Sequence, residues 1–136
     1  MNWILAGIIT AIIWFVAGAI LYLNPMAKEI QDKHKKDPAV KKWKKQNEFM
    51  MFMFFFGVLI PSIIFAYVLV LISPVLPSAT WPKILAFGLL LVGIKIIPRW
   101  ADMAAMSSYP KDLLVMDLIN GSIAMFVVSA SLVMML

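Results

Sequence analysis

The sequence predicts an all-α integral membrane protein: a four-helix bundle with four transmembrane helices and both chain termini outward. Three observations predict this class. The 136 residues are 63% hydrophobic and only 14% charged, whereas a soluble domain of this length needs far more polar surface. The apolar residues fall into four runs, each about 20 residues or longer, which is the length that spans a bilayer as a helix. Lysines concentrate between the first two runs, and their position sets the orientation.

The four spans are expected at about residues 3–23, 49–72, 81–100 and 110–136, in a single domain that covers residues 1–136. Helices are expected because a backbone in lipid must satisfy its hydrogen bonds within its own segment. The first run is uncharged from Met1 to Ala27, so it lacks the basic start of a signal peptide and is expected to remain as a helix. Pro25 ends this span, because the residue before a proline disfavours the α region.

Prolines also mark bends and ends in the later spans. Pro61 lies inside the second span, where its missing N–H removes the helical partner of the Gly57 carbonyl and predicts a kink. The sequence is compatible with two roles for this proline, a static kink and a hinge. The stretch SSYPKD predicts the start of the fourth span, because serine caps helices, proline fits the first turn and Asp112 complements the positive helix end.

The basic loop, residues 24–48, sets the orientation of the spans. It carries most of the lysines of the chain, while the connection between the second and third spans has only Lys83. Positively charged loops stay on the cytoplasmic side. This loop and the connection between the third and fourth spans are therefore expected in the cytoplasm, and the chain is expected to be a multi-pass protein of the cell membrane with both termini outside.

Small and polar residues form one face of the first span and one face of the fourth. At 100° per residue, one narrow face of the first helix carries Gly7, Thr10, Ala11, Trp14 and Gly18. One face of the fourth carries Asp117, Asn120, Gly121, Ala124, Val128 and Ser131. Small residues at such spacing let helices approach closely. Both faces are therefore expected to pack against protein rather than lipid.

Charged and polar residues at the cytoplasmic ends of the third and fourth spans form a candidate polar cluster. Its members are Lys95, Arg99, Asp102, Asp117 and Asn120. The three on the third helix share one side with Gly88 and Met106 if Pro98 does not twist the helix much. The faces of the two helices then oppose each other across a short hairpin.

The depths of Lys95 and Asp117 predict an ion pair. At 1.5 Å per residue, Lys95 lies about 7 Å along the axis from Trp100, and Asp117 lies about 10 Å from Pro110. Both are then at similar depth below the cytoplasmic interface, where a lone charge costs a few kcal/mol. Asp117 is therefore predicted to pair with Lys95 or Arg99.

Two roles for this cluster are open. In the first, the ion pair locks the third and fourth helices, with Asn120 as a hydrogen-bond neighbour, while Lys95 and Arg99 extend toward the interface. In the second, the cluster is a proton or ion site or a polar pocket, since charges inside a span are functional candidates.

The basic loop contains a candidate lipid-contact segment. It consists of Lys41, Lys42, Trp43, Lys44 and Lys45. The loop is broken by Pro38 and is compatible with two short interfacial helices, in which Trp43 lies at the headgroups and the lysines contact anionic lipid. A solvated loop whose charge only fixes topology is the other reading. A nucleic-acid partner is not expected, because a lone tryptophan among lysines provides no stacking platform.

The composition gives little material for cofactor or catalytic chemistry. There is no cysteine and one histidine, His34, so thiolate sites are excluded and zinc or haem ligation by this chain is not expected. No cofactor, metal or catalytic residue is predicted. A membrane enzyme acting on lipid or quinone ranks lowest, because no serine lies beside a base and no histidine lies inside a span.

Two stretches resemble a known group of proteins. They are NWILAGIITAIIWFVAGAILYLNP and YPKDLLVMDLINGSIAMFVVSASLVM, in the first and last quarters of the chain. Each has an aromatic or proline start followed by small or polar residues at helical spacing. They look like the small uncharacterised four-helix membrane proteins of bacteria that are grouped as domains of unknown function. The resemblance implies a four-helix bundle and no activity. Small multidrug transporters have similar length, but the first helix here lacks their glutamate.

The leading functional expectation is a structural or accessory membrane protein, either self-associating or a subunit of a larger membrane assembly. Four helices bury little surface in one chain, and small-residue faces favour association. The alternative is a small oligomeric ion channel or transporter that uses the polar cluster at the cytoplasmic ends of the third and fourth helices.

Overall fold

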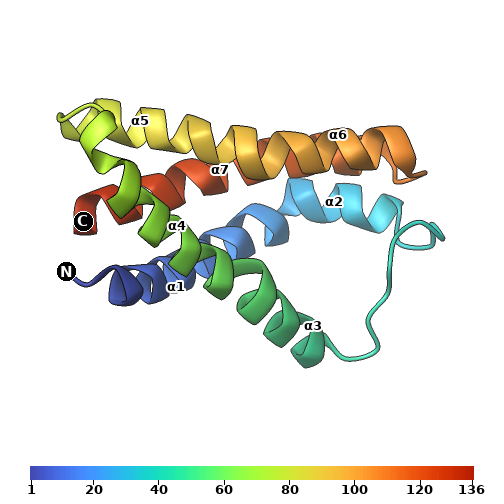
Figure 1. Ribbon diagram of the computed structural model, residues 1–136. Helices are drawn as coiled ribbons and strands as arrows, with labels where there is room; N and C mark the ends of the chain where they lie inside the picture. Colours follow the sequence, from blue (N-terminus) through green and yellow to red (C-terminus); the bar gives the residue numbers. More distant parts are fainter.

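The computed structural model describes residues 1–136 and contains helices and no strands (Figure 1), which confirms the all-α class. The α-helices are α1 (Trp3–Leu23), α2 (Pro25–Lys33), α3 (Gln46–Phe52), α4 (Ile60–Ile72), α5 (Thr80–Leu91), α6 (Ile97–Met106) and α7 (Lys111–Met135). Two π-helical segments, η1 (Met53–Leu59) and η3 (Val92–Ile96), and one 3₁₀ turn, η2 (Ser73–Val75), join them. Four continuous helical stretches are long and apolar enough to cross a membrane: Trp3–Leu23, Gln46–Val75, Thr80–Met106 and Lys111–Met135.

The first and last spans form the centre of the bundle. α7 packs against both α1 and α5, and α1 packs against both α7 and α4. α4 and α5 flank this pair and make no comparable contact with each other. The two termini lie at the same end of the molecule (Figure 1), as an even number of crossings requires. The arrangement is that of a multi-pass membrane protein with four spans.

Hydrogen bonds from side chains join α7 to both of its main neighbours, α1 and α5. Thr10 Oγ1 on α1 and Ser131 Oγ on α7 lie 2.8 Å apart. Ser129 Oγ donates to the carbonyl of Ile84 on α5 over 2.7 Å. Both Thr10 and Ser129 are fully buried. Such bonds satisfy hydroxyls that would otherwise lie unpaired in an apolar interior.

The predicted small-residue faces pack inside the chain. On α1, Gly7, Thr10, Ala11 and Trp14 are buried, and only Gly18 is half-exposed with open space beside it. A Cβ on Gly7 would lie 2.7 Å from Cα of Ile63, so glycine allows α1 and α4 to touch backbone to backbone. Along α7, every residue of the predicted face is buried or half-buried. The expectation that these faces contact protein is confirmed except at Gly18.

A widened π turn precedes Pro61 and Pro98, the two prolines that lie away from the ends of their spans. Near Pro61 the N–H of Ile60 donates to the carbonyl of Phe55, and near Pro98 the N–H of Ile97 donates to the carbonyl of Val92. Both are i→i+5 bonds. An α turn would place the proline ring against the carbonyl four residues earlier, and the wider turn relieves that clash. The kink predicted at Pro61 thus takes the form of a π segment.

The second span begins with an arm that leaves the bundle. The arm is defined as Gln46–Leu59, that is α3 and η1. η1 packs on α1, where the rings of Phe54 and Phe15 meet edge to face at 5.4 Å. α3 packs only on η1, and none of its residues is buried. Figure 1 shows α3 diverging from α5 and α6 toward the basic loop.

Candidate functional site

The five residues of the predicted polar cluster do not gather at one point. Lys95 lies on η3, Arg99 and Asp102 lie on α6, and Asp117 and Asn120 lie on α7. Arg99 and Asp102 are exposed, whereas the other three are half-buried. The expected common side of the third span is therefore wrong. The π turn before Pro98 takes up an extra residue and rotates everything beyond it relative to an uninterrupted α-helix.

Lys95 turns inward and lies over an aromatic ring. Its Nζ is 5.1 Å from the ring centroid of Trp14 on α1. Trp14 is buried and stacks on Phe65 of α4 at 6.3 Å. The third span continues to Met106, eleven residues beyond Lys95, which places this amine about 16 Å from the end of the helix. Cation–π attraction to Trp14 therefore contributes to the stability of this half-buried amine, and the extension of Lys95 toward the interface stays a prediction.

The predicted ion pair of Asp117 is also wrong. No basic nitrogen lies within ion-pair distance of its carboxylate, since the ion pairs of the chain involve other residues. Asp117 is therefore half-buried on α7 without a basic partner at ion-pair distance.

Asn120 joins a set of amides that caps α1. Its Nδ2 donates to the carbonyl of Leu21 over 3.1 Å, and Asn24 Nδ2 donates to the same oxygen over 2.6 Å. Gln31 Nε2 donates to the carbonyl of Tyr22 over 3.0 Å. The last carbonyls of a helix lack helical partners, and three side-chain amides supply them here. Asn120 therefore binds the backbone of α1, and its predicted role as a hydrogen-bond neighbour of the ion pair is wrong.

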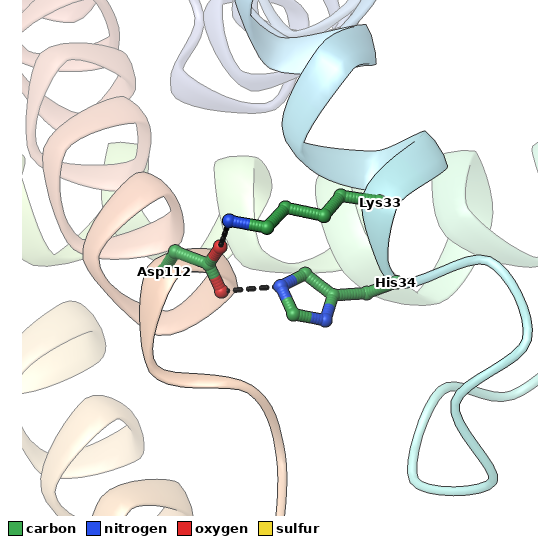
Figure 2. A network of polar contacts seen from close by, with 3 residues as sticks. All are labelled: Lys33, His34 and Asp112. Carbon is green, nitrogen blue, oxygen red and sulfur yellow. Dashed lines mark ion pairs between the residues drawn. The ribbon is translucent and has the colours of Figure 1, made fainter.

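A polar contact that sequence reasoning missed ties α2 to the start of α7. His34 Nε2 lies 2.6 Å from Asp112 Oδ1, and Lys33 Nζ lies 3.8 Å from Asp112 Oδ2 (Figure 2). The sequence assigned Asp112 only to the positive end of its helix. The sequence signals for this contact are the single histidine, His34, and an aspartate at the start of a helix, Asp112. Their positions in the sequence do not indicate that the two side chains are in contact.

A small apolar cluster supports this contact. Ala27, Leu113 and Met116 are buried together, with Tyr109 packed against them. Burial raises the pKa of the Tyr109 phenol above its usual value, and the charge of Asp117 adds to this effect. The cluster fixes α2 alongside the first turns of α7.

The candidate lipid-contact segment has an ordered aromatic centre. Trp43 packs on Phe49 and Phe52, with ring centroids 5.6 Å apart in each pair. Lys41 Nζ lies 4.6 Å from the centroid of the Trp43 ring. Lys41, Lys42, Lys44 and Lys45 are exposed. The segment itself is not helical, and the basic loop forms one helix, α2, instead of two.

Two surface grooves lie at opposite ends of the bundle. The first, about 280 Å³, lies beside both termini and is lined by Ser73 and Lys83 among apolar side chains. The second, about 360 Å³, lies between α2 and α7 and includes Asn24, Asp112 and Asn120 in its lining. No three acidic or histidine side chains come together as metal ligands.

Comparison with known proteins identifies a family for this fold. The model of the family described as "Protein of unknown function (DUF1761)" matches residues 5–133. No curated protein and no solved structure matches the chain. The resemblance to uncharacterised membrane proteins is confirmed, and it extends over nearly all of the chain instead of its first and last quarters. The protein belongs to the DUF1761 family.

Proposed function

We propose that the chain is a structural or accessory membrane protein that associates through its arm, with copies of itself or with other subunits of a membrane assembly. The observation that carries this proposal is that α3 is exposed and has almost no contact with the other helices. It has seven residues, none of them buried, and it packs on no other helix than η1. α3 is the beginning of the continuous second span, Gln46–Val75, yet it lacks the contacts with other spans that hold the rest of this helix in the bundle. A partner surface is therefore expected there.

The composition of the arm supports a protein partner. Its exposed large side chains are Met50, Met51, Phe52, Met53, Phe55 and Phe56. Aromatic residues and methionine are enriched at protein interfaces, and methionine adapts to irregular surfaces. The small-residue faces of α1 and α7 are occupied within the chain, so the arm is the better candidate for association.

The use of the polar residues supports a structural role. Thr10, Ser129 and Asn120 each make a hydrogen bond that joins two helices. His34 and Asp112 join α2 to α7. Each of these contacts holds the bundle together, and none leaves a polar path through the centre of the chain.

The basic segment from Lys41 to Lys45 is proposed to contact anionic headgroups beside the arm. Trp43 packs on α3, while the four lysines are exposed and can contact lipid phosphates. Such anchoring would hold the start of the arm at the membrane surface.

Cysteine cross-linking in native membranes tests the association. The chain contains no cysteine, so Met51→Cys and Phe56→Cys each introduce a single thiol on the arm. Leu89→Cys on α5, also strongly exposed, is the matched control. With mild oxidant, both arm variants are expected to form a disulfide-linked species of twice the chain mass, or of another mass if the partner is a different subunit. Cross-linking of the control alone, or of all three alike, would contradict the proposal.

The second candidate function is a small oligomeric ion channel or transporter, and the position of Lys95 favours it. This amine lies deep in the third span with no carboxylate within ion-pair distance. An unpaired charge at that depth is costly and is typical of ion pathways. Because basic side chains line anion pores, the pathway would favour anions.

Chloride flux into proteoliposomes tests the second candidate. Lys95→Met removes the buried amine, and Lys83→Met at the opposite end of the same span is the control. Flux through the unaltered chain that falls at least tenfold in Lys95→Met and not in Lys83→Met supports a pathway. Absence of flux through the unaltered chain speaks against it.

A further inference from the structure

The groove between α2 and α7 has apolar walls at the edge of the membrane. Its volume of about 360 Å³ falls within the range of small-molecule sites, roughly 300–1,000 Å³. Met26 and Ile30 line it from α2, and Val115 and Ile119 line it from α7. Met26, Val115 and Ile119 are exposed in the free chain. Since α7 crosses the membrane and α2 starts where α1 ends, the groove lies at the height of the lipid headgroups and glycerol.

Polar groups lie at the two ends of the groove. Asp112 is at the end nearer the loops and Asn120 at the end nearer the bundle centre. Eight residues of α7 separate them, which corresponds to about 12 Å. A ligand that is charged at one end, polar at its middle and apolar beyond matches this order.

Asp112 at the charged end of the groove is only loosely paired with Lys33, which stands beside the groove and outside its lining. Lys33 Nζ stands 3.8 Å from Asp112 Oδ2, which exceeds the length of a hydrogen bond, about 2.7–3.2 Å. The Lys33 side chain is 72% exposed and that of Asp112 is 39% exposed. The ammonium group of Lys33 has three donors and a carboxylate accepts several bonds, so both have free capacity. His34 occupies only the other carboxylate oxygen (Figure 2).

The deep end presents an amide with unused hydrogen-bonding groups. Asn120 uses one N–H for the carbonyl of Leu21. Its second N–H and its carbonyl oxygen have no protein partner among the hydrogen bonds of the chain. A half-buried amide at the edge of the hydrocarbon needs such a partner, because unpaired polar groups there are costly. The ester carbonyls of a glycerolipid lie at that depth.

We propose that this groove binds one glycerophospholipid whose headgroup carries a primary ammonium, as in phosphatidylethanolamine. Its phosphate lies against Lys33, its ammonium donates to Asp112, its ester carbonyl accepts from Asn120, and its chains leave past Ile119. A choline headgroup has no N–H to donate, and a glycerol headgroup has no positive charge. The site does not depend on the association through the arm.

Native mass spectrometry of the full chain tests the headgroup. The protein is purified in mild detergent, depleted of lipid and offered phosphatidylethanolamine, phosphatidylcholine and phosphatidylglycerol with identical chains. We expect the first to be retained about tenfold more tightly than either other lipid, a difference of about 1.4 kcal/mol, as one charge-assisted hydrogen bond supplies. Equal retention of the three lipids, or preference for another one, overturns the proposal.

Two tryptophan variants test the location. Ile119→Trp fills the groove, and Ile123→Trp, about one turn further along α7 and outside the lining, is the control. Both positions are exposed in the free chain, at 54% and 44%, so neither substitution overpacks the core. Ile119→Trp is expected to lose retention of phosphatidylethanolamine at least tenfold, while Ile123→Trp retains it. Equal retention by both variants shows that the lipid binds elsewhere.

A third variant separates headgroup recognition from groove shape. Asp112→Asn removes the negative charge and leaves the apolar walls unchanged. It is expected to erase the preference for phosphatidylethanolamine over phosphatidylcholine. A preference that survives in Asp112→Asn excludes the carboxylate as the partner of the ammonium.

Discussion

Replacing Gly7 by alanine should force α1 away from α4. A Cβ at this position lies 2.7 Å from Cα of Ile63, whereas ordinary contact starts at 3.4 Å, so the helices must separate by about 0.7 Å. The obstacle is backbone, which cannot rotate away as a side chain can. Overpacking of this kind costs about 1–3 kcal/mol. Gly18 provides the control, because a Cβ there meets nothing within 4 Å.

The two alanine variants share the gain from helix propensity, about 0.5–1 kcal/mol. Gly18→Ala should therefore stabilise the protein slightly, and Gly7→Ala should destabilise it by up to about 2 kcal/mol. Their difference in the free energy of unfolding isolates the contact with Ile63, at about 1–3 kcal/mol. Unfolding with sodium dodecyl sulfate in mixed micelles, followed by helical circular dichroism, measures it. If Gly7→Ala proves as stable as Gly18→Ala, α1 and α4 do not touch at Gly7 and the reasoning fails.

Three further predictions follow from hydrogen bonds and burial. Thr10→Val removes the bond to Ser131. It is expected to lower the free energy of unfolding by about 0.6 kcal/mol, and by no more than about 1.7 kcal/mol, in the same micelle titration. An unchanged free energy of unfolding would show that this bond is absent. Asn120→Leu removes the donor to Leu21 and should speed amide hydrogen exchange in the last turn of α1, whereas unchanged exchange would contradict the cap. Tyr109 has a pKa raised above 10.0 by burial, so its contribution to stability is fully present below about pH 10 and is lost as the phenol ionises above that value. Tyr109→Phe should flatten the decline of melting temperature at alkaline pH, and an unchanged slope would assign it to another group.

The long apolar runs were sufficient to predict the class and the number of spans. Four stretches of the required length and hydropathy exist in the structure, because spanning a bilayer depends on local composition. The small-residue faces of α1 and α7 were also predictable from local composition. Residues such as Gly7 and Ala124 have little side chain to place in lipid and allow close approach of helices.

The polar contacts were not predictable, because they depend on rotation and on distant pairing. Lys95 was expected beside Asp117, but Lys95 lies inside the π segment Val92–Ile96, which changes its direction and that of the side chains that follow. Assigning residues to helix faces from the sequence assumes 3.6 residues in each turn. This assumption does not detect a π-helical segment. The contact of His34 with Asp112 joins residues far apart in the sequence, and it depends on the bend at Pro25.

The central position of α7 has a consequence for biogenesis. α5 packs on α7 and on its own continuation η3, and on no other span. During synthesis, the third span therefore enters the bilayer before its packing partner exists, and it must remain in lipid or against the translocation machinery until the last helix emerges. The bond between Thr10 and Ser131 likewise joins the first span to the fourth. The bundle is thus completed only when α7 has entered the membrane, so a ribosome stalled before α7 leaves an insertion intermediate that membrane quality control can recognise.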